Sequence, residues 1–228
     1  MYTPKSIPIR MTRGLVLVAA TAALSTPALL FSGCGDSSND TASTQPLVIK
    51  ISRPAPGVVE IIDGMNDIGA GQGVTSAPSW LDINWASIAQ EGENLKFSID
   101  VAGKLPDTMQ PGFVAAESGF LLDLEKDGAP DWGIYAAFTK QGWSPGLYNK
   151  KTKERIADAQ FPGTFTHDGT TLVFTIKSSV IGSPKSFKWF AYTDAGIVTD
   201  TNGTMANAGD RIGDQTVAND SSAWPEYP

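Results

Sequence analysis

One short segment carries carboxylates at alternating positions and a further carboxylate after a turn. Its members are Asp123, Glu125, Asp127 and Asp131. Calcium takes about six to eight oxygen ligands, and carboxylates spaced by two beside a glycine-containing turn supply several of them at once. An EF-hand loop starts with this spacing, but it ends in a bidentate glutamate at its twelfth position, which here is Ile134. Two interpretations stay open: a calcium site, or an acidic hairpin that keeps a strand end soluble.

A second acidic group lies earlier in the chain. It consists of Asp63, Asn66, Asp67 and Asp82. The side-chain oxygens of Asp and Asn are ligands that calcium accepts, so this group is a second candidate for the same ion. Loose acidic patterns also occur without a bound ion, and a solvated acidic loop is the alternative.

The aromatic side chains offer a different chemistry, because a flat indole can stack on the C–H face of a sugar ring. Of the six tryptophans, Trp143 is the strongest candidate, since its glycine, serine and proline neighbours are too small to bury an indole. Tyr148 and Asn149 follow closely and would supply hydrogen bonds to hydroxyl groups. The tryptophans that fall in alternating segments are expected in the core: Trp85, Trp132 and Trp189.

Catalytic and redox chemistry find less support. His167 is the only histidine and stands in a His-Asp-Gly turn. Haem iron usually needs His, Met, Cys or Tyr as an axial ligand, and a haem-binding redox carrier is kept as an alternative. A serine triad would need a nucleophile motif that the sequence lacks. The carboxylates of Asp123 and Glu125 would need a defined separation to hydrolyse glycosides, which strand alternation does not establish. We therefore expect no enzyme activity.

Cys34 is the only cysteine, and it follows a segment with the parts of a signal peptide. Three basic residues precede an apolar stretch over residues 15–31, which is too interrupted to make a spanning helix of about 20 apolar residues. The closing Phe-Ser-Gly-Cys resembles the lipobox of bacterial lipoproteins, with Phe31 where leucine is usual. This resemblance implies that residues 1–33 are removed and that the lipidated Cys34 holds the protein on a membrane, facing the periplasm or the cell exterior. An ordinary secreted protein or an uncleaved anchor is the alternative.

The rest of the chain divides into a tether and one domain. Residues 34–46 comprise the cysteine and a segment without large apolar side chains, which cannot bury enough surface to offset its ordering entropy. Residues 47–228 have the length of a single domain. Removing the leader takes away three of 17 basic residues and none of 24 acidic ones, which leaves 14 against 24 and a formal charge of −10. This acidic balance argues against nucleic acid and is compatible with cations, sugars or a protein partner.

The apolar pattern is that of strands. Residues 95–101 alternate apolar and polar side chains, which predicts a strand with one buried face. Turn signals separate this strand from others. The further candidates are residues 58–62, 81–88, 120–124, 132–138, 172–176 and 187–191, with a single helical turn at 178–182. Eight or more short strands in roughly 180 residues predict an all-β fold, an antiparallel β-sandwich of jelly-roll type.

The order of these features resembles a known family. The motifs are the Asp-rich opening at 63–67, Trp80-Leu81-Asp82-Ile83, the strand at 95–99, the acidic-ended strand at 120–128, and the strand at 172–176 followed by Val180-Ile181-Gly182. On these motifs residues 58–228 resemble the sandwich superfamily that includes family 9 carbohydrate-binding modules and DOMON domains. The resemblance implies a carbohydrate-type ligand, so we expect a lipid-anchored, non-catalytic binding module with a calcium-stabilised loop. A structural or assembly lipoprotein that binds a protein of the cell envelope is the alternative.

Overall fold

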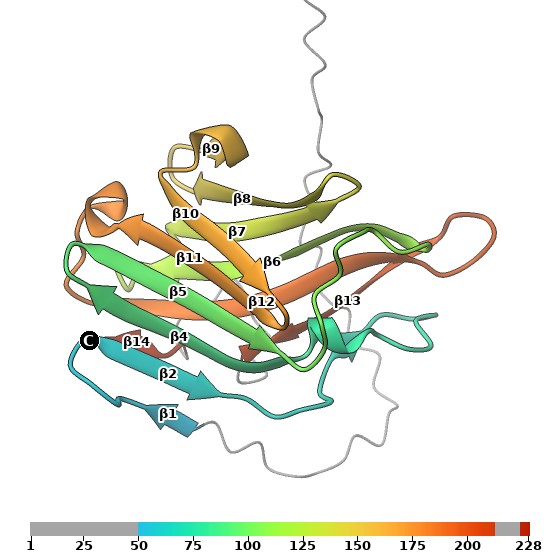
Figure 1. Ribbon diagram of the computed structural model, residues 1–228, viewed down its shortest axis with the longest axis horizontal. Coiled ribbons are helices and arrows are strands. Elements are labelled where there is room, and N and C mark those ends of the chain that lie inside the picture. The colour runs from blue at the N-terminus through green and yellow to red at the C-terminus, as the bar shows by residue number, and fades with distance from the viewer. Residues whose placement is uncertain (1–49, 213–223) are drawn as a thin grey trace, which may run out of the picture. The chain divides into compact units, whose positions relative to one another are not determined.

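Two antiparallel β-sheets pack face to face in this protein (Figure 1). The computed structural model describes residues 50–212 and 224–228. The prediction of an all-β antiparallel sandwich is confirmed. Within the described ranges no helix has the length and the apolar character needed to cross a membrane.

The first sheet has six strands in the spatial order β1-β2-β4-β5-β11-β10. Their bounds are β1 Lys50–Ser52, β2 Val58–Ile62, β4 Ile83–Glu91, β5 Asn94–Val101, β10 Gly163–Asp168 and β11 Thr171–Lys177. The second sheet has the order β3-β13-β12-β6-β7-β8-β9, and β14 pairs with β12. Its strands are β3 Gly69–Ala70, β6 Phe113–Asp123, β7 Trp132–Thr139, β8 Gly142–Asn149, β9 Glu154–Ala157, β12 Phe187–Val198, β13 Met205–Arg211 and β14 Glu226–Tyr227. Three single 3-10 turns complete the described elements: η1 Ser79–Leu81, η2 Asp158–Gln160 and η3 Ser178–Ile181.

The predicted alternation places side chains as expected in β5. Leu95, Phe97 and Ile99 are buried in the core. Their strand pairs with β4 on one side and with β11 on the other. Gly92 closes the turn between β4 and β5 with a φ of 64°, a left-handed conformation that favours glycine. Lys150, Lys151 and Lys153 lie in the turn between β8 and β9.

The core is organised around aromatic rings contributed by both sheets. Phe120 of β6 has its ring centroid 5.3 Å from that of Phe97 in β5 and 6.5 Å from that of Phe174 in β11. It also lies 5.9 Å from the indole of Trp189 in β12. All four side chains have no solvent exposure. These ring contacts join the two sheets near the middle of the sandwich.

Strand β8 differs from the expectation. The segment around Trp143 is not among the predicted strands, but it pairs with β7 from Gly142 to Asn149. Only the second half, from Gly146 onward, also pairs with β9. Pro145 therefore sits where β8 is an edge strand, the position at which a residue without an N–H is tolerated in a sheet.

Candidate functional site

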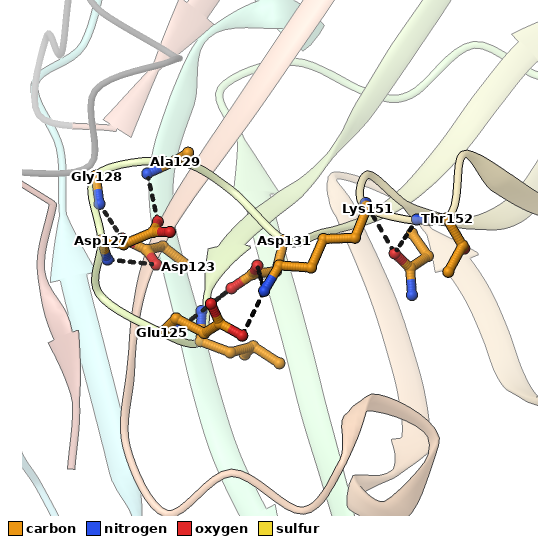
Figure 2. Close-up of polar contacts among 10 residues, drawn as sticks. Asp123, Glu125, Asp127, Gly128, Ala129, Asp131, Lys151 and Thr152 are labelled. Atoms are coloured by element: carbon orange, nitrogen blue, oxygen red, sulfur yellow. Dashed lines mark hydrogen bonds and ion pairs between the residues drawn. The ribbon is translucent and has the colours of Figure 1, made fainter.

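The acidic turn between β6 and β7 binds its own carboxylates through backbone amides (Figure 2). The N–H groups of Asp127 and Gly128 donate to Asp123 Oδ1 and Oδ2 at 3.3 and 3.2 Å. The N–H groups of Leu124 and Glu125 donate to Asp131 Oδ2 at 2.7 and 3.2 Å. Asp123 and Asp131 are buried, so these bonds replace the water that the carboxylates lose on folding.

Lys151, in the turn between β8 and β9, forms ion pairs with two carboxylates of the acidic turn. Its Nζ lies 3.2 Å from Asp131 Oδ1 and also forms an ion pair with Glu125. The hydrogen bond to Glu125, followed by the interactions with Asp131, raises the pKa of Lys151. Asp127 is turned outward and its Oδ1 accepts from the N–H of Ala129 at 3.1 Å. These contacts support the acidic-hairpin interpretation, and calcium at this turn stays a prediction.

A different set of carboxylates comes together in the structure. Within residues 50–212 and 224–228, the one set of three acidic side chains with ligand oxygens within 4.8 Å of one another is Asp67, Asp82 and Asp210. Two of them belong to the second acidic group of the sequence. Asn66 of that group contributes its backbone N–H, which donates to Asp82 Oδ2 at 2.8 Å. Asp210 was missed, because its position depends on how β13 pairs with β12 and the local sequence carries no sign of that.

Strand β8 belongs to one sheet and β10 to the other (Figure 1). Side chains from these two strands line an aromatic cleft. Its volume is about 380 Å³. The lining residues are Trp143, Pro145, Phe161, Gly163, Phe165 and His167. Strand alternation explains the gathering, since Trp143 and Pro145 share one face of β8 while Phe165 and His167 share one face of β10.

Trp143 serves both the core and the cleft. Its ring stacks on Phe138 at a centroid distance of 4.8 Å and an interplanar angle of 26°. Its Nε1–H donates to the carbonyl oxygen of Pro106 at 3.0 Å. The side chain remains half-buried, and its ring centroid lies 6.4 Å from that of His167 across the cleft. The stacking and the hydrogen bond therefore fix the position of the indole.

Tyr148 and Asn149 do not join Trp143. Side chains in a strand alternate between its two faces. Tyr148 is five positions after Trp143, so it lies on the opposite face of β8. The guanidinium of Arg155 lies over the rings of Tyr148 and Tyr135 at 5.5 and 5.4 Å from the centroids. Asn149 Oδ1 accepts the N–H groups of Lys151 and Thr152 at 2.9 and 3.0 Å. Tyr148 therefore packs with Arg155 on the outer face of β8, and Asn149 stabilises the β8–β9 turn.

The other tryptophans follow the expectation only in part. Trp189 is fully buried, whereas Trp85 and Trp132 are half-buried. Trp80 and Trp224, which flank prolines in the sequence, are buried too. The sequence also did not single out Phe161 and Phe165 as cleft residues. Phe165 takes its position from the pairing of β10 with β11, and Phe161 lies just before β10.

His167 is exposed at the cleft and does not belong to a metal-ligating set within the part of the chain that the structure describes. Met65 and Met205 are exposed, the latter at the start of β13, and Met109 packs against the core. Cys34, the leader and the first residues of the domain lie outside the described residues.

The described residues thus form an antiparallel β-sandwich with an aromatic cleft lined by residues of β8 and β10. Comparison of the chain with protein-family models, with curated proteins and with solved structures gave no match.

Proposed function

We propose that this chain is a non-catalytic, lipid-anchored binding module of the cell envelope, and that its aromatic cleft takes a carbohydrate-class ligand. The observation that carries the proposal is the concentration of three aromatic side chains and one imidazole around a cleft of about 380 Å³. This volume falls near the lower end of the range of about 300–1,000 Å³ that is usual for small-molecule sites.

The residue types in the cleft favour a sugar over an ionic ligand. Trp143, Phe161 and Phe165 are half-buried, so each presents part of a ring to the cleft while the rest packs against the core. A sugar ring has apolar C–H faces that stack on such rings and hydroxyl groups at its edge. His167 supplies imidazole nitrogens that can form hydrogen bonds with those hydroxyls.

Substitutions at the β10 side of the cleft test the proposal. Phe165→Ala and His167→Ala are each expected to weaken saccharide binding by about fivefold or more, since one aromatic contact contributes on the order of 1 kcal/mol. A glycan array identifies the saccharide, and isothermal titration calorimetry gives its affinity for each variant. Tyr148→Ala is the matched control, because this ring lies on the outer face of β8 and should leave the affinity unchanged. Equal affinity in the cleft variants would refute the cleft as the binding site.

Trp143→Ala is a poorer test of binding than the sequence suggests. The variant would lose the stacking on Phe138 and the hydrogen bond to Pro106 together with any ligand contact. A loss of stability would then accompany a loss of binding. His167→Ala avoids this ambiguity because His167 is exposed, whereas Phe165 also packs on the buried Phe174 at a ring-centroid distance of 5.0 Å.

The anchor is tested independently of the cleft. Cys34→Ser is expected to move the protein almost completely from the membrane to the soluble fraction, because the acyl chains contribute about 0.8 kcal/mol per buried methylene. Fractionation followed by immunoblotting measures the change. Continued membrane association of the variant would show that residues 15–31 remain as the anchor.

A second candidate function, binding of an envelope protein, is favoured by an exposed apolar patch. Val198 of β12 pairs with Met205 of β13, and Val114 of β6 lies beside Gly196, two residues before Val198. Their exposed fractions are 36%, 56% and 46%. Exposed apolar patches mark protein-binding surfaces when they are contiguous. A protein that binds no glycan and whose partner is lost on Val198→Ser would favour this second function.

A further inference from the structure

Three segments that are distant in the sequence meet at one end of the sandwich. Asp67 lies in the loop between β2 and β3, Asp82 follows η1 at the start of β4, and Asp210 lies in β13. Each offers a carboxylate oxygen, and these oxygens lie within 4.8 Å of one another. Asp82 and Asp210 are both only 2% exposed.

The backbone around Asp82 is fixed on both sides. Its N–H donates to Ser79 O at 3.2 Å, and its carbonyl accepts from Ala102 at 2.8 Å. The carboxylate of Asp210 reaches across from the other sheet, where its Oδ2 accepts the N–H of Ile83 at 2.7 Å. The two carboxylates are thus held near each other by strand pairing and by hydrogen bonds that span the sandwich.

Asp82 carries a buried carboxylate oxygen that lacks a hydrogen-bond partner within the described ranges. Asp82 Oδ2 accepts the N–H of Asn66 at 2.8 Å, whereas Asp82 Oδ1 is buried and has no hydrogen-bond partner among the described residues. A buried carboxylate oxygen without a partner costs free energy, so such atoms call for an explanation. Two further carboxylates beside it would increase the cost through repulsion.

We infer that Asp67, Asp82 and Asp210 form a calcium site that ties the β2–β3 loop and the start of β4 to β13. Calcium binds oxygen ligands at about 2.3–2.6 Å, so two oxygens on the same ion lie at most about 5 Å apart. The spacing of these three carboxylates fits that limit. The ion would coordinate Asp82 Oδ1 and would offset the negative charge of the three carboxylates. The site is independent of the aromatic cleft and of the acidic turn between β6 and β7.

Calcium alone is the probe, added to the full-length protein and removed with chelator. At a calcium concentration about one hundred times the Kd, the melting temperature is expected to rise by about 5–10 °C. Asp82→Asn keeps the shape of the side chain and removes its charge. This variant should lose most of the calcium-induced shift, and its affinity by calorimetry should fall at least tenfold. In chelator it should melt no lower than the wild type, because the substitution relieves repulsion.

Two further variants make the result decisive. Asp67→Asn removes a ligand from a half-buried loop position and should also lose most of the shift. Asp127→Asn makes the same chemical change in the acidic turn and should keep the full shift. The inference is overturned if the wild type shows no calcium-dependent shift, if the shift survives in both Asp82→Asn and Asp67→Asn, or if Asp127→Asn abolishes it.

Discussion

Phe120→Ala is expected to lower the free energy of unfolding by about 3–5 kcal/mol, the usual cost of removing a buried phenylalanine ring. The ring is fully buried and contacts Phe97, Phe174 and Trp189 from three different strands. Because these partners come from both sheets, the surroundings cannot collapse onto the cavity without moving the sheets together. Urea denaturation followed by tryptophan fluorescence or circular dichroism measures the change.

Val114→Ala is the control on the same strand. Its side chain is 46% exposed, so the substitution should change the free energy of unfolding by less than about 0.5 kcal/mol. A loss of under about 1 kcal/mol for Phe120→Ala would contradict the role assigned to this ring as the contact between the sheets.

The stability of the protein in chelator is expected to fall as the pH rises from about 4 to about 8. Burial raises the pKa of the Asp210 carboxyl from 3.8 to about 8, against the effect of the Ile83 N–H, and the carboxylates of Asp67 and Asp63 add to the increase. The folded state therefore binds this proton more tightly than the unfolded chain does. This contribution to stability is fully present below the pKa of Asp210 in the unfolded chain. It is lost as the pH rises through the pKa of Asp210 in the folded protein. The loss is on the order of 5 kcal/mol, at about 1.4 kcal/mol per pH unit.

Asp210→Asn separates this effect from other titrating groups. Burial also raises the pKa of Glu117 and of Asp194, so these carboxyls add a slope of the same sign. The variant should flatten most of the decline between pH 4 and 8 in chemical denaturation. An unchanged slope in Asp210→Asn would assign the pH dependence to Glu117 and Asp194 instead.

The strands with clear alternation were predictable because packing follows the same two-residue period as the side chains. The predicted segment 58–62 is strand β2, and the segment 95–101 lies within β5. The strands that escaped prediction lack this signal. In β8 the pattern is interrupted by Pro145 and by Gly146, where a Cβ would lie 2.3 Å from the ring of Tyr135. In β13 a Cβ on Gly209 would lie 2.2 Å from the carbonyl oxygen of Thr193, so close strand approach selects glycine over a β-former.

Among the candidate site residues, those marked by their sequence neighbours could be predicted, and those brought in by strand pairing could not. Trp143 could be singled out from its small neighbours, and the structure places it in the cleft. Tyr148 and Asn149 were grouped with it because they are close in sequence, but the alternation of β8 and the turn that follows send them elsewhere. Phe165 and Asp210 take their places from pairings between strands, which no local spacing reveals.

Mapping the bound saccharide on the protein tests the proposed function most directly. The full-length protein, labelled with ¹⁵N, is titrated with a saccharide selected on the glycan array, and the backbone amide shifts are followed by NMR. The largest shifts are expected in residues 142–147 of β8 and 161–167 around β10, which border the aromatic cleft. Shifts confined to the outer face of β8, around Tyr148 and Arg155, or no binding to any glycan on the array, would contradict the account.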